Sequence, residues 1–204
     1  MSYKDFTLEQ IEQFNVIIQG NIDLFGNQFS AIAVNPAFKN YLDYSTKLAL
    51  AINTEKARSE MIIAPILVEL KRLADDQISL FSGIEFNVDA AKGLNGFCDF
   101  MISRSTQQFY IQAPVAIIVE AKNENIKGGL AQCFATMIAA NIFNQAKGNQ
   151  IDAVYGAVTT GNQWKFLKLQ ANTAYIDAAD YYIDRIGQIV AVLLFMVNAQ
   201  PISV

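Results

Sequence analysis

The apolar segment PVAIIVEAK, residues 114–122, is the clearest feature in the pattern of hydrophobic and polar positions. Both faces of a strand formed by these residues would be apolar until Glu120 and Lys122 appear at its end. Because side chains two positions apart point to the same face of a strand, these two charges would lie side by side. A strand that is apolar on both faces is typical of the middle of a sheet covered by helices on both sides. We therefore predict a buried central strand that ends in a carboxylate and an ammonium group.

Two earlier segments, residues 79–89 and 96–105, predict strands next to this one. In the second segment Phe97, Asp99 and Met101 share one face, and both faces are apolar apart from Asp99. A buried carboxylate is costly unless it is paired or bound to a cation. Asp99 is therefore a candidate functional residue on a strand adjacent to residues 114–122.

Helices are predicted before and after these strands, with a hairpin near the end of the chain. Thr7 is the expected cap of the first helix, and Pro65 is expected to kink or to start the second. Tyr181 and Tyr182 are expected to be core residues of the last helix. The order predicts an α/β fold, a three-layer αβα sandwich around a mixed sheet. The predicted helices cover residues 6–52, about 55–75, 125–148 and 178–198, and the hairpin covers residues 152–170 with its turn at TGN.

Glu60 has an unusual place in the second predicted helix. With Ile63, Leu67 and Leu70 it recurs at helical spacing, so a carboxylate lies along the apolar stripe. It is either a functional group or a charge near the helix end that reaches solvent. The residues by themselves favour the second interpretation.

The absence of histidine among the 204 residues limits the chemistry. It excludes Ser-His-Asp and Cys-His catalysis and imidazole metal sites. Carboxylates without histidine favour hard cations such as Mg²⁺ or Mn²⁺. The two cysteines, Cys98 and Cys133, are too few for a four-ligand zinc site or a disulfide framework.

Composition predicts a globular protein in the cytoplasm. With 52% apolar residues the chain can bury a sizeable core, and we expect one compact domain. No secretory signal is recognisable at the N-terminus, and the late apolar run IVAVLLFMVNA is shorter than the ~20 residues that span a bilayer, so no membrane association is expected. The net charge of −4 disfavours a strongly basic nucleic-acid surface but permits a local basic groove.

A glycine pair, Gly128 and Gly129, follows the charged end of the central strand. The sequence KGG occurs there, but no G-x-x-x-x-G-K-[ST] pattern precedes a helix, which excludes a P-loop. A surface turn explains the break in the apolar pattern. It does not explain the spacing of Glu120 and Lys122.

Taken together, these segments resemble the PD-(D/E)-x-K nuclease superfamily, which has the restriction-endonuclease-like fold. The resemblance rests on CD at residues 98–99, EAK at 120–122, an upstream helix with Glu60, and GLAQCFATMIAA with Gln132. The later segment VYGAVTTGNQWKFLKL is similar to the strand pair of type I restriction-enzyme nuclease domains and of small stand-alone cyanobacterial proteins. Cys98 stands where the family name has proline. The resemblance divides the chain into an N-terminal helical extension (1–54), a nuclease core (55–170) and a C-terminal helix (171–204).

The resemblance implies a role for each matching residue. Asp99, Glu120 and the Ala121 carbonyl would coordinate Mg²⁺ or Mn²⁺, with Glu60 as a further or outer ligand. Lys122 would position or activate the attacking water and offset charge on the phosphate, and Gln132 would orient the motif. Converging buried carboxylates predict that at least one has a raised pKa when metal is absent, and that metal binding stabilises the fold.

The implied activity is hydrolysis of phosphodiester bonds, with DNA favoured over RNA, in restriction, repair or defence. The first alternative is a nuclease-fold subunit that binds nucleic acid or a protein but does not cut, and the second is a small-molecule-binding α/β domain. In the simplest structural interpretation, Glu120 and Lys122 form an ion pair at a strand end and Asp99 caps a turn. Because the chain is acidic, a basic channel could require a homodimer that joins cations of two subunits, namely Arg104, Lys127, Lys165 and Lys168.

Overall fold

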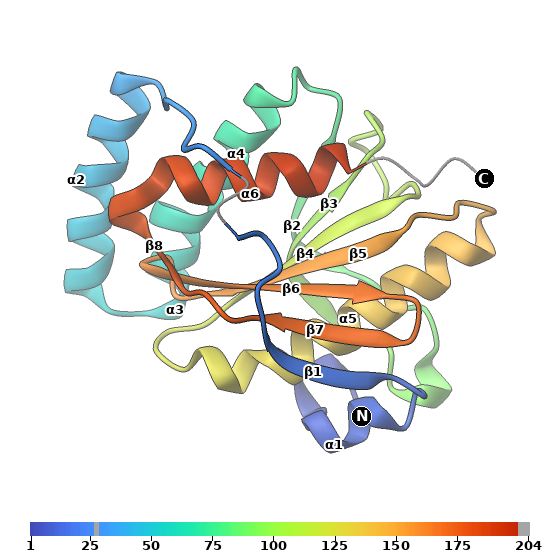
Figure 1. The fold of residues 1–204 in the computed structure, drawn as a ribbon. Coiled ribbons are helices and arrows are strands. Elements are labelled where there is room, and N and C mark those ends of the chain that lie inside the picture. The colour runs from blue at the N-terminus through green and yellow to red at the C-terminus, as the bar shows by residue number, and fades with distance from the viewer. Residues whose placement is uncertain (27–28, 200–204) are drawn as a thin grey trace.

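One mixed β-sheet forms the centre of the protein (Figure 1). The computed structural model describes residues 1–26 and 29–199. Within these residues the strands lie in the order β1-β7-β6-β5-β4-β3-β2, and β8 pairs with β6. The strands are β1 (Ile17–Ile22), β2 (Ser79–Glu85), β3 (Phe97–Ser103), β4 (Val115–Ala121), β5 (Ala153–Thr159), β6 (Gln163–Gln170), β7 (Thr173–Asp177) and β8 (Tyr181–Tyr182).

Helices cover both faces of the sheet (Figure 1). The α-helices are α1 (Leu8–Glu12), α2 (Pro36–Ile52), α3 (Glu55–Arg58), α4 (Ala64–Leu73), α5 (Ile126–Ala146) and α6 (Ile186–Asn198). The shorter turns are η1 (Tyr3–Asp5), the π-helical η2 (Ser59–Ile63), η3 (Ala90–Lys92) and η4 (Ile183–Arg185). Helices α2, α4 and α6 bury one core against the sheet, and α5, α1 and η1 bury the other. The predicted three-layer αβα class is confirmed.

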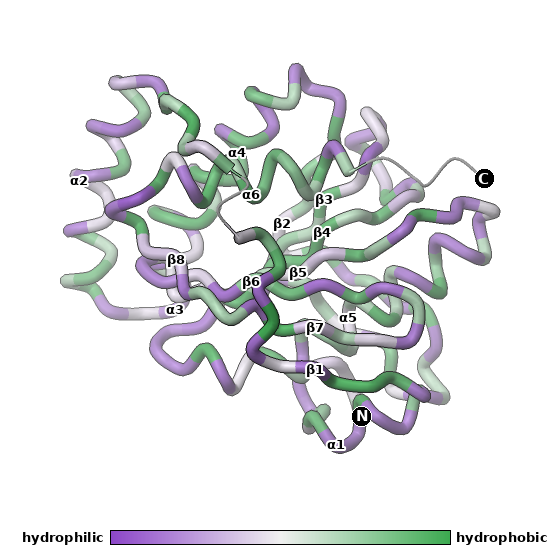
Figure 2. Tube along the Cα trace, in the orientation of Figure 1, coloured by the Kyte–Doolittle hydropathy of each residue, from purple (hydrophilic) through white to green (hydrophobic). Residues whose placement is uncertain are grey.

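Hydrophobic residues gather along the central strands and the helices that cover them, and hydrophilic residues gather at the outer turns (Figure 2). Every residue of β4 and of β5 is buried, which for β4 confirms the predicted central strand. Helix α5 is long and apolar enough to cross a membrane, but 67% of its apolar window is buried inside the fold. It is therefore a core helix of this fold.

Strands β2, β3 and β4 are antiparallel neighbours, which confirms the predicted sheet order. The pairing of β3 with β4 begins at Phe100 and Val119, so Asp99 and Glu120 lie one position beyond it. Strand β5 lies parallel to β4, and α5 makes the crossover between them. The start of α5 is therefore brought next to the end of β4.

A buried asparagine fixes α5 against β4. The Asn144 side chain accepts a hydrogen bond from the Val115 N–H at 2.7 Å and donates one to the Val115 carbonyl at 2.8 Å. Because this pairing joins the far end of the helix to the start of the strand, it sets which residues of α5 lie opposite the end of β4.

The prediction that residues 6–52 are all helical is wrong. Thr7 does cap α1, accepting from the Gln10 N–H at 3.3 Å, but β1 follows before α2 begins. Strand β1 pairs in parallel with β7, with Ile17 opposite Thr173. Its partner is distant in sequence, so no local pattern distinguishes this β-branched segment from a helix. The segment 1–54 is accordingly not an all-helical extension.

The last helix begins later than predicted, at Ile186 instead of residue 178. Tyr181 and Tyr182 form β8 and pair with Trp164 and Gln163 of β6, so their predicted place in a helix is wrong. Of the C-terminal segment 171–204, residues 171–177 include β7 and residues 200–204 lie outside the described residues.

The other predicted elements are present. The second helix is made of α3, η2 and α4, and Pro65 lies in the first turn of α4, directly after the π-helical turn η2. Strands β5 and β6 form the predicted hairpin, with Gly161 at a φ of +80° in its TGN turn.

Candidate active site

Asp99, Glu120 and Lys122 meet where β3 and β4 separate. The Ala121 N–H donates to Asp99 Oδ2 at 2.7 Å, and Lys122 Nζ lies 2.5 Å from Glu120 Oε1. Glu120 is 2% exposed, whereas Asp99 is half-buried. The contact between Glu120 and Lys122 that the simple structural interpretation expects is thus present, but Asp99 accepts a hydrogen bond from the backbone of the neighbouring strand instead of capping a turn.

Lys122 is held at both ends. Its backbone N–H donates to the Thr159 carbonyl of β5 at 2.8 Å, and its Nζ also lies 3.2 Å from Gln132 Oε1 on α5. Gln132 therefore contacts Lys122 of the motif. An ammonium group has three N–H donors, and within the described residues two have acceptors here. One donor is left for a water molecule or a substrate oxygen.

Gly129 is explained by the close approach of α5 to β5 and to Lys122. A Cβ atom at Gly129 would lie 2.6 Å from Val158 Cγ1 and 3.1 Å from Lys122 Cε. Any side chain there would therefore displace either the helix or the lysine. The neighbouring Gly128 meets only the amide of Asn125, whose side chain caps α5 by accepting from the Gly128 N–H.

Burial and charge raise the pKa of one carboxylate, as predicted. Burial first, and then the charge of Asp99, raise the pKa of Glu120 to about 8, although Lys122 opposes the shift. For Lys122, burial by itself would lower the pKa, but Glu120, Glu55 and Asp99 outweigh it and the pKa is raised. Lys122 therefore stays positively charged at neutral pH.

Glu60 does not join the other carboxylates. Its side chain is 57% exposed and its carboxylate lies 2.6 Å from Lys56 Nζ. The π-helical turn η2 adds a residue to the turn and so breaks the spacing on which the apolar stripe was based. The placement of Glu60 as a metal ligand is corrected, and it is the solvent-exposed charge that its own segment favoured.

Glu55 at the start of α3 is the helix carboxylate whose charge acts on Lys122. Sequence analysis missed it because an acidic residue in the first turn of a helix is common on electrostatic grounds alone. The sequence feature that could have pointed to Glu55 is Thr54 before it. The Thr54 side chain accepts a hydrogen bond from the Ala57 N–H and so caps the start of α3.

Arg58 is a second residue that sequence analysis missed. It is 8% exposed and donates to the Asn123 side chain at 3.1 Å, the Thr160 carbonyl at 2.9 Å and the Asn53 side chain at 2.9 Å. These contacts tie α3 to the loop after β4 and to the β5–β6 turn. Arg58 therefore supports the backbone on both sides of Lys122.

The donor set fits a hard divalent cation bound in part by water or substrate. Among residues 1–26 and 29–199, no cluster of three His, Cys, Asp or Glu side chains is arranged to hold a metal. Asp99 and Glu120 supply two carboxylates, next to the backbone of Ala121. Magnesium is commonly bound by one or two carboxylates, waters and phosphate oxygens, so this smaller set is sufficient.

The four cations proposed for a shared channel are not all available. Arg104 donates to the Met196 carbonyl at 2.9 Å. Lys165 donates to the Asp177 and Ala179 carbonyls and lies 2.7 Å from Asp180 Oδ1. Both are committed to contacts within the chain, which leaves Lys127 and Lys168 of the set.

No family model matches the chain, and no curated protein sequence matches it.

A substitution at Gly129 tests how closely Lys122 depends on α5. Gly129→Ala is expected to lower the free energy of unfolding by about 1–3 kcal/mol, the usual cost of overpacking, in urea denaturation. Gly128→Ala is the control, expected to be neutral or slightly stabilising because alanine favours helix. When Lys122 is also alanine, Gly129→Ala should lower the free energy of unfolding by less, because the new methyl group then no longer meets the Lys122 side chain and crowds only Val158. Equal stability of Gly129→Ala and wild type would contradict the close approach.

Proposed function

We propose that the protein is a metal-dependent nuclease of the PD-(D/E)-x-K type that hydrolyses phosphodiester bonds, with DNA as substrate, in restriction, repair or defence. The observation that carries the proposal is the meeting of Asp99, Glu120 and Lys122 at the ends of two adjacent strands, with Gln132 on Lys122 Nζ. The two buried cysteines are free, which goes with a cytoplasmic setting.

Lys122 acts in this proposal as a fixed positive charge. Because its pKa is raised, it does not serve as the proton acceptor at neutral pH. Its remaining N–H donor orients the attacking water or contacts a non-bridging phosphate oxygen. A preorganised charge of this kind is worth about 10²–10³ in rate.

The two carboxylates and the Ala121 carbonyl hold Mg²⁺ or Mn²⁺. When bound, the cation lowers the pKa of a water molecule and neutralises charge on the phosphate. Glu120, whose pKa is about 8 without metal, must lose its proton to serve as a ligand. Glu55 stands close enough to Lys122 to help keep it charged.

The test uses supercoiled plasmid, single-stranded DNA and RNA as parallel substrates, each with Mg²⁺ and with Mn²⁺. We expect cleavage of DNA that requires the divalent ion and stops with a chelator. Protein that cuts none of the three substrates with either ion would contradict the proposal.

The second candidate function is a nuclease-fold subunit that binds nucleic acid or a partner protein without cutting. It is favoured by the net charge of −4 and by the internal contacts of Arg104 and Lys165, which leave little basic surface. It predicts that binding persists in the assay above while cleavage is absent with both ions.

A further inference from the structure

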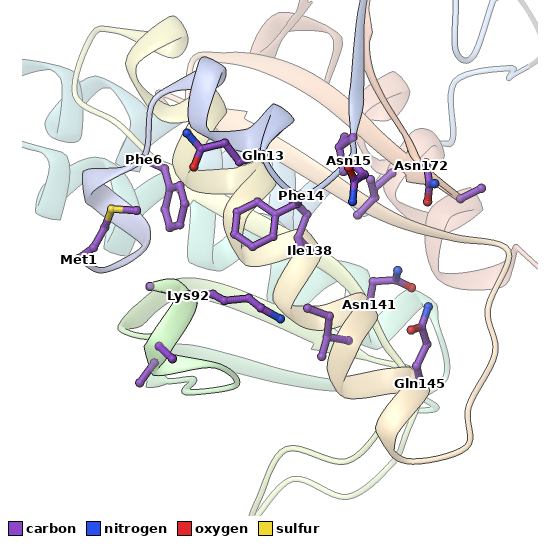
Figure 3. A pocket seen from close by; sticks show the side chains of 17 residues that line it. Met1, Phe6, Gln13, Phe14, Asn15, Lys92, Ile138, Asn141, Gln145 and Asn172 are labelled. Carbon is purple, nitrogen blue, oxygen red and sulfur yellow. The ribbon is translucent and has the colours of Figure 1, made fainter.

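A cavity of about 840 Å³ lies away from the proposed nuclease site. It is enclosed by the segment around α1, by η3, by the second half of α5 and by the β6–β7 turn (Figure 3). Neither Asp99, Glu120 nor Lys122 lines it. Along α5, Asn141 in its wall is nine residues beyond Gln132, roughly 14 Å at 1.5 Å per residue.

The floor of the cavity is apolar and partly aromatic. The rings of Phe6 and Phe14 lie 5.8 Å apart between centroids and are tilted by 52°. Ile138, Ile142 and Leu169 complete the floor. Phe14 is half-buried, so part of its ring faces the cavity. This surface accepts a flat apolar group.

Five side-chain amides surround the same hollow, from three separate segments of the chain (Figure 3). Within residues 1–26 and 29–199 no hydrogen bond joins any of these amide groups to another protein group. Each amide offers a donor and an acceptor, so together they match a ligand whose edge carries both. They are Gln13, Asn15, Asn141, Gln145 and Asn172.

The charge of the lining disfavours cationic ligands. Lys92 is the only charged side chain among the described residues that line the cavity, and it pairs with Asp89 at 3.1 Å. The described lining contains no carboxylate. A purely apolar ligand is also disfavoured, because it would cover amides without replacing their hydrogen bonds to water.

We infer that this cavity binds a nucleotide, with the base against Phe14, the base edge on the amides and the phosphate toward Lys92. A nucleobase combines a planar apolar face with an edge of donors and acceptors, and its π-face stacks on aromatic side chains whatever its sequence. The volume lies in the range of about 300–1,000 Å³ typical of small-ligand sites. The inference does not depend on the proposed nuclease activity, because the cavity shares no lining residue with that site.

The experiment is calorimetric titration of the full chain in a chelator, with each of the four ribonucleoside monophosphates and with a five-nucleotide deoxyadenosine strand. Binding of a monophosphate identifies a free nucleotide as the ligand, and binding of the strand alone identifies a nucleotide within single-stranded nucleic acid. Gln145→Met removes one of these hydrogen bonds and is expected to weaken binding about tenfold. Gln150→Met, an exposed amide outside the lining, is the matched control and should bind as wild type does.

Asn141→Leu is the second variant, with the same expected loss. Lys39→Met, at an exposed lysine on α2 outside the lining, should bind as wild type does. The inference is overturned if no nucleotide and no strand binds at millimolar concentration. It is equally overturned if glucose or inorganic phosphate binds as well as the nucleotides, or if Gln145→Met binds as wild type does.

Discussion

Lys122→Met is expected to lower the rate of DNA cleavage by about 10²–10³ while the fold is kept. Methionine retains the apolar stem that packs beside Gly129 and removes only the charge. The Lys122 side chain is 21% exposed, so this substitution is safer than truncation to alanine, which would leave a gap. The measurement is plasmid cleavage in Mg²⁺ under single-turnover conditions, with circular dichroism to check folding.

Two further variants test whether Lys122 and Asp99 act together in catalysis. Asp99→Ala should abolish activity through loss of a metal ligand, and the double variant should be hardly slower than Asp99→Ala, because residues that act together are not additive. Lys39→Ala removes an exposed lysine paired with Asp43 on α2 and should cut as fast as wild type. Variants at Lys122 and Asp99 that cut at the wild-type rate would exclude these residues from catalysis.

The stability of the metal-free protein is expected to fall as the pH rises from about 4.5 to about 8. In this window the folded protein keeps a proton on Glu120, whose pKa is about 8, while the unfolded chain, with the ordinary value of 4.5, has lost it. The native state then binds more protons, so stability is fully present below the lower pKa and is lost toward the upper one. Glu120 therefore contributes a negative slope to the free energy of unfolding against pH within this window.

Mg²⁺ should counteract this loss, because it binds the deprotonated carboxylate. The rise in melting temperature at 10 mM Mg²⁺, followed by calorimetry, should be largest near pH 8 and small near pH 5. Glu120→Gln is the matched variant and should lack both the slope and the response to Mg²⁺. Because burial also raises the pKa of Asp177, the difference between wild type and Glu120→Gln is the quantity to use. If the stability of Glu120→Gln falls with pH as steeply as that of wild type, the titrating group is a residue other than Glu120.

The sheet around the candidate site could be predicted because its strands carry their own signal. Residues 115–121 are apolar on both faces, and only a strand covered on both sides buries all of them. The outer strand β1 could not be predicted in this way. Its residue Ile17 is 62% exposed, and its backbone is paired with β7, more than 150 positions later, so the partner decides its conformation.

The candidate site likewise has residues that the sequence predicted and residues that it did not. Asp99, Glu120 and Lys122 stood out in the sequence because charge within a buried strand is costly and therefore rare. Glu60 also stood out, but wrongly, since its place on the stripe assumed 3.6 residues per turn and η2 departs from that spacing. The sequence also contained Glu55 and Arg58 without marking them, because surface-type residues near a helix start have many ordinary uses.

By itself, then, the sequence determined the buried strands, the α/β class and the three charged residues at the strand ends. It could do so because the apolar pattern within each short segment shows that the segment is buried. The tertiary structure decided which groups surround them. Only the packing of α5 on β4, held by Asn144, brings Gln132 to Lys122 and makes Gly129 necessary. Contacts between segments distant in the chain depend on how whole elements pack, and the amide-lined cavity between α1, α5 and the β6–β7 turn arises in the same way.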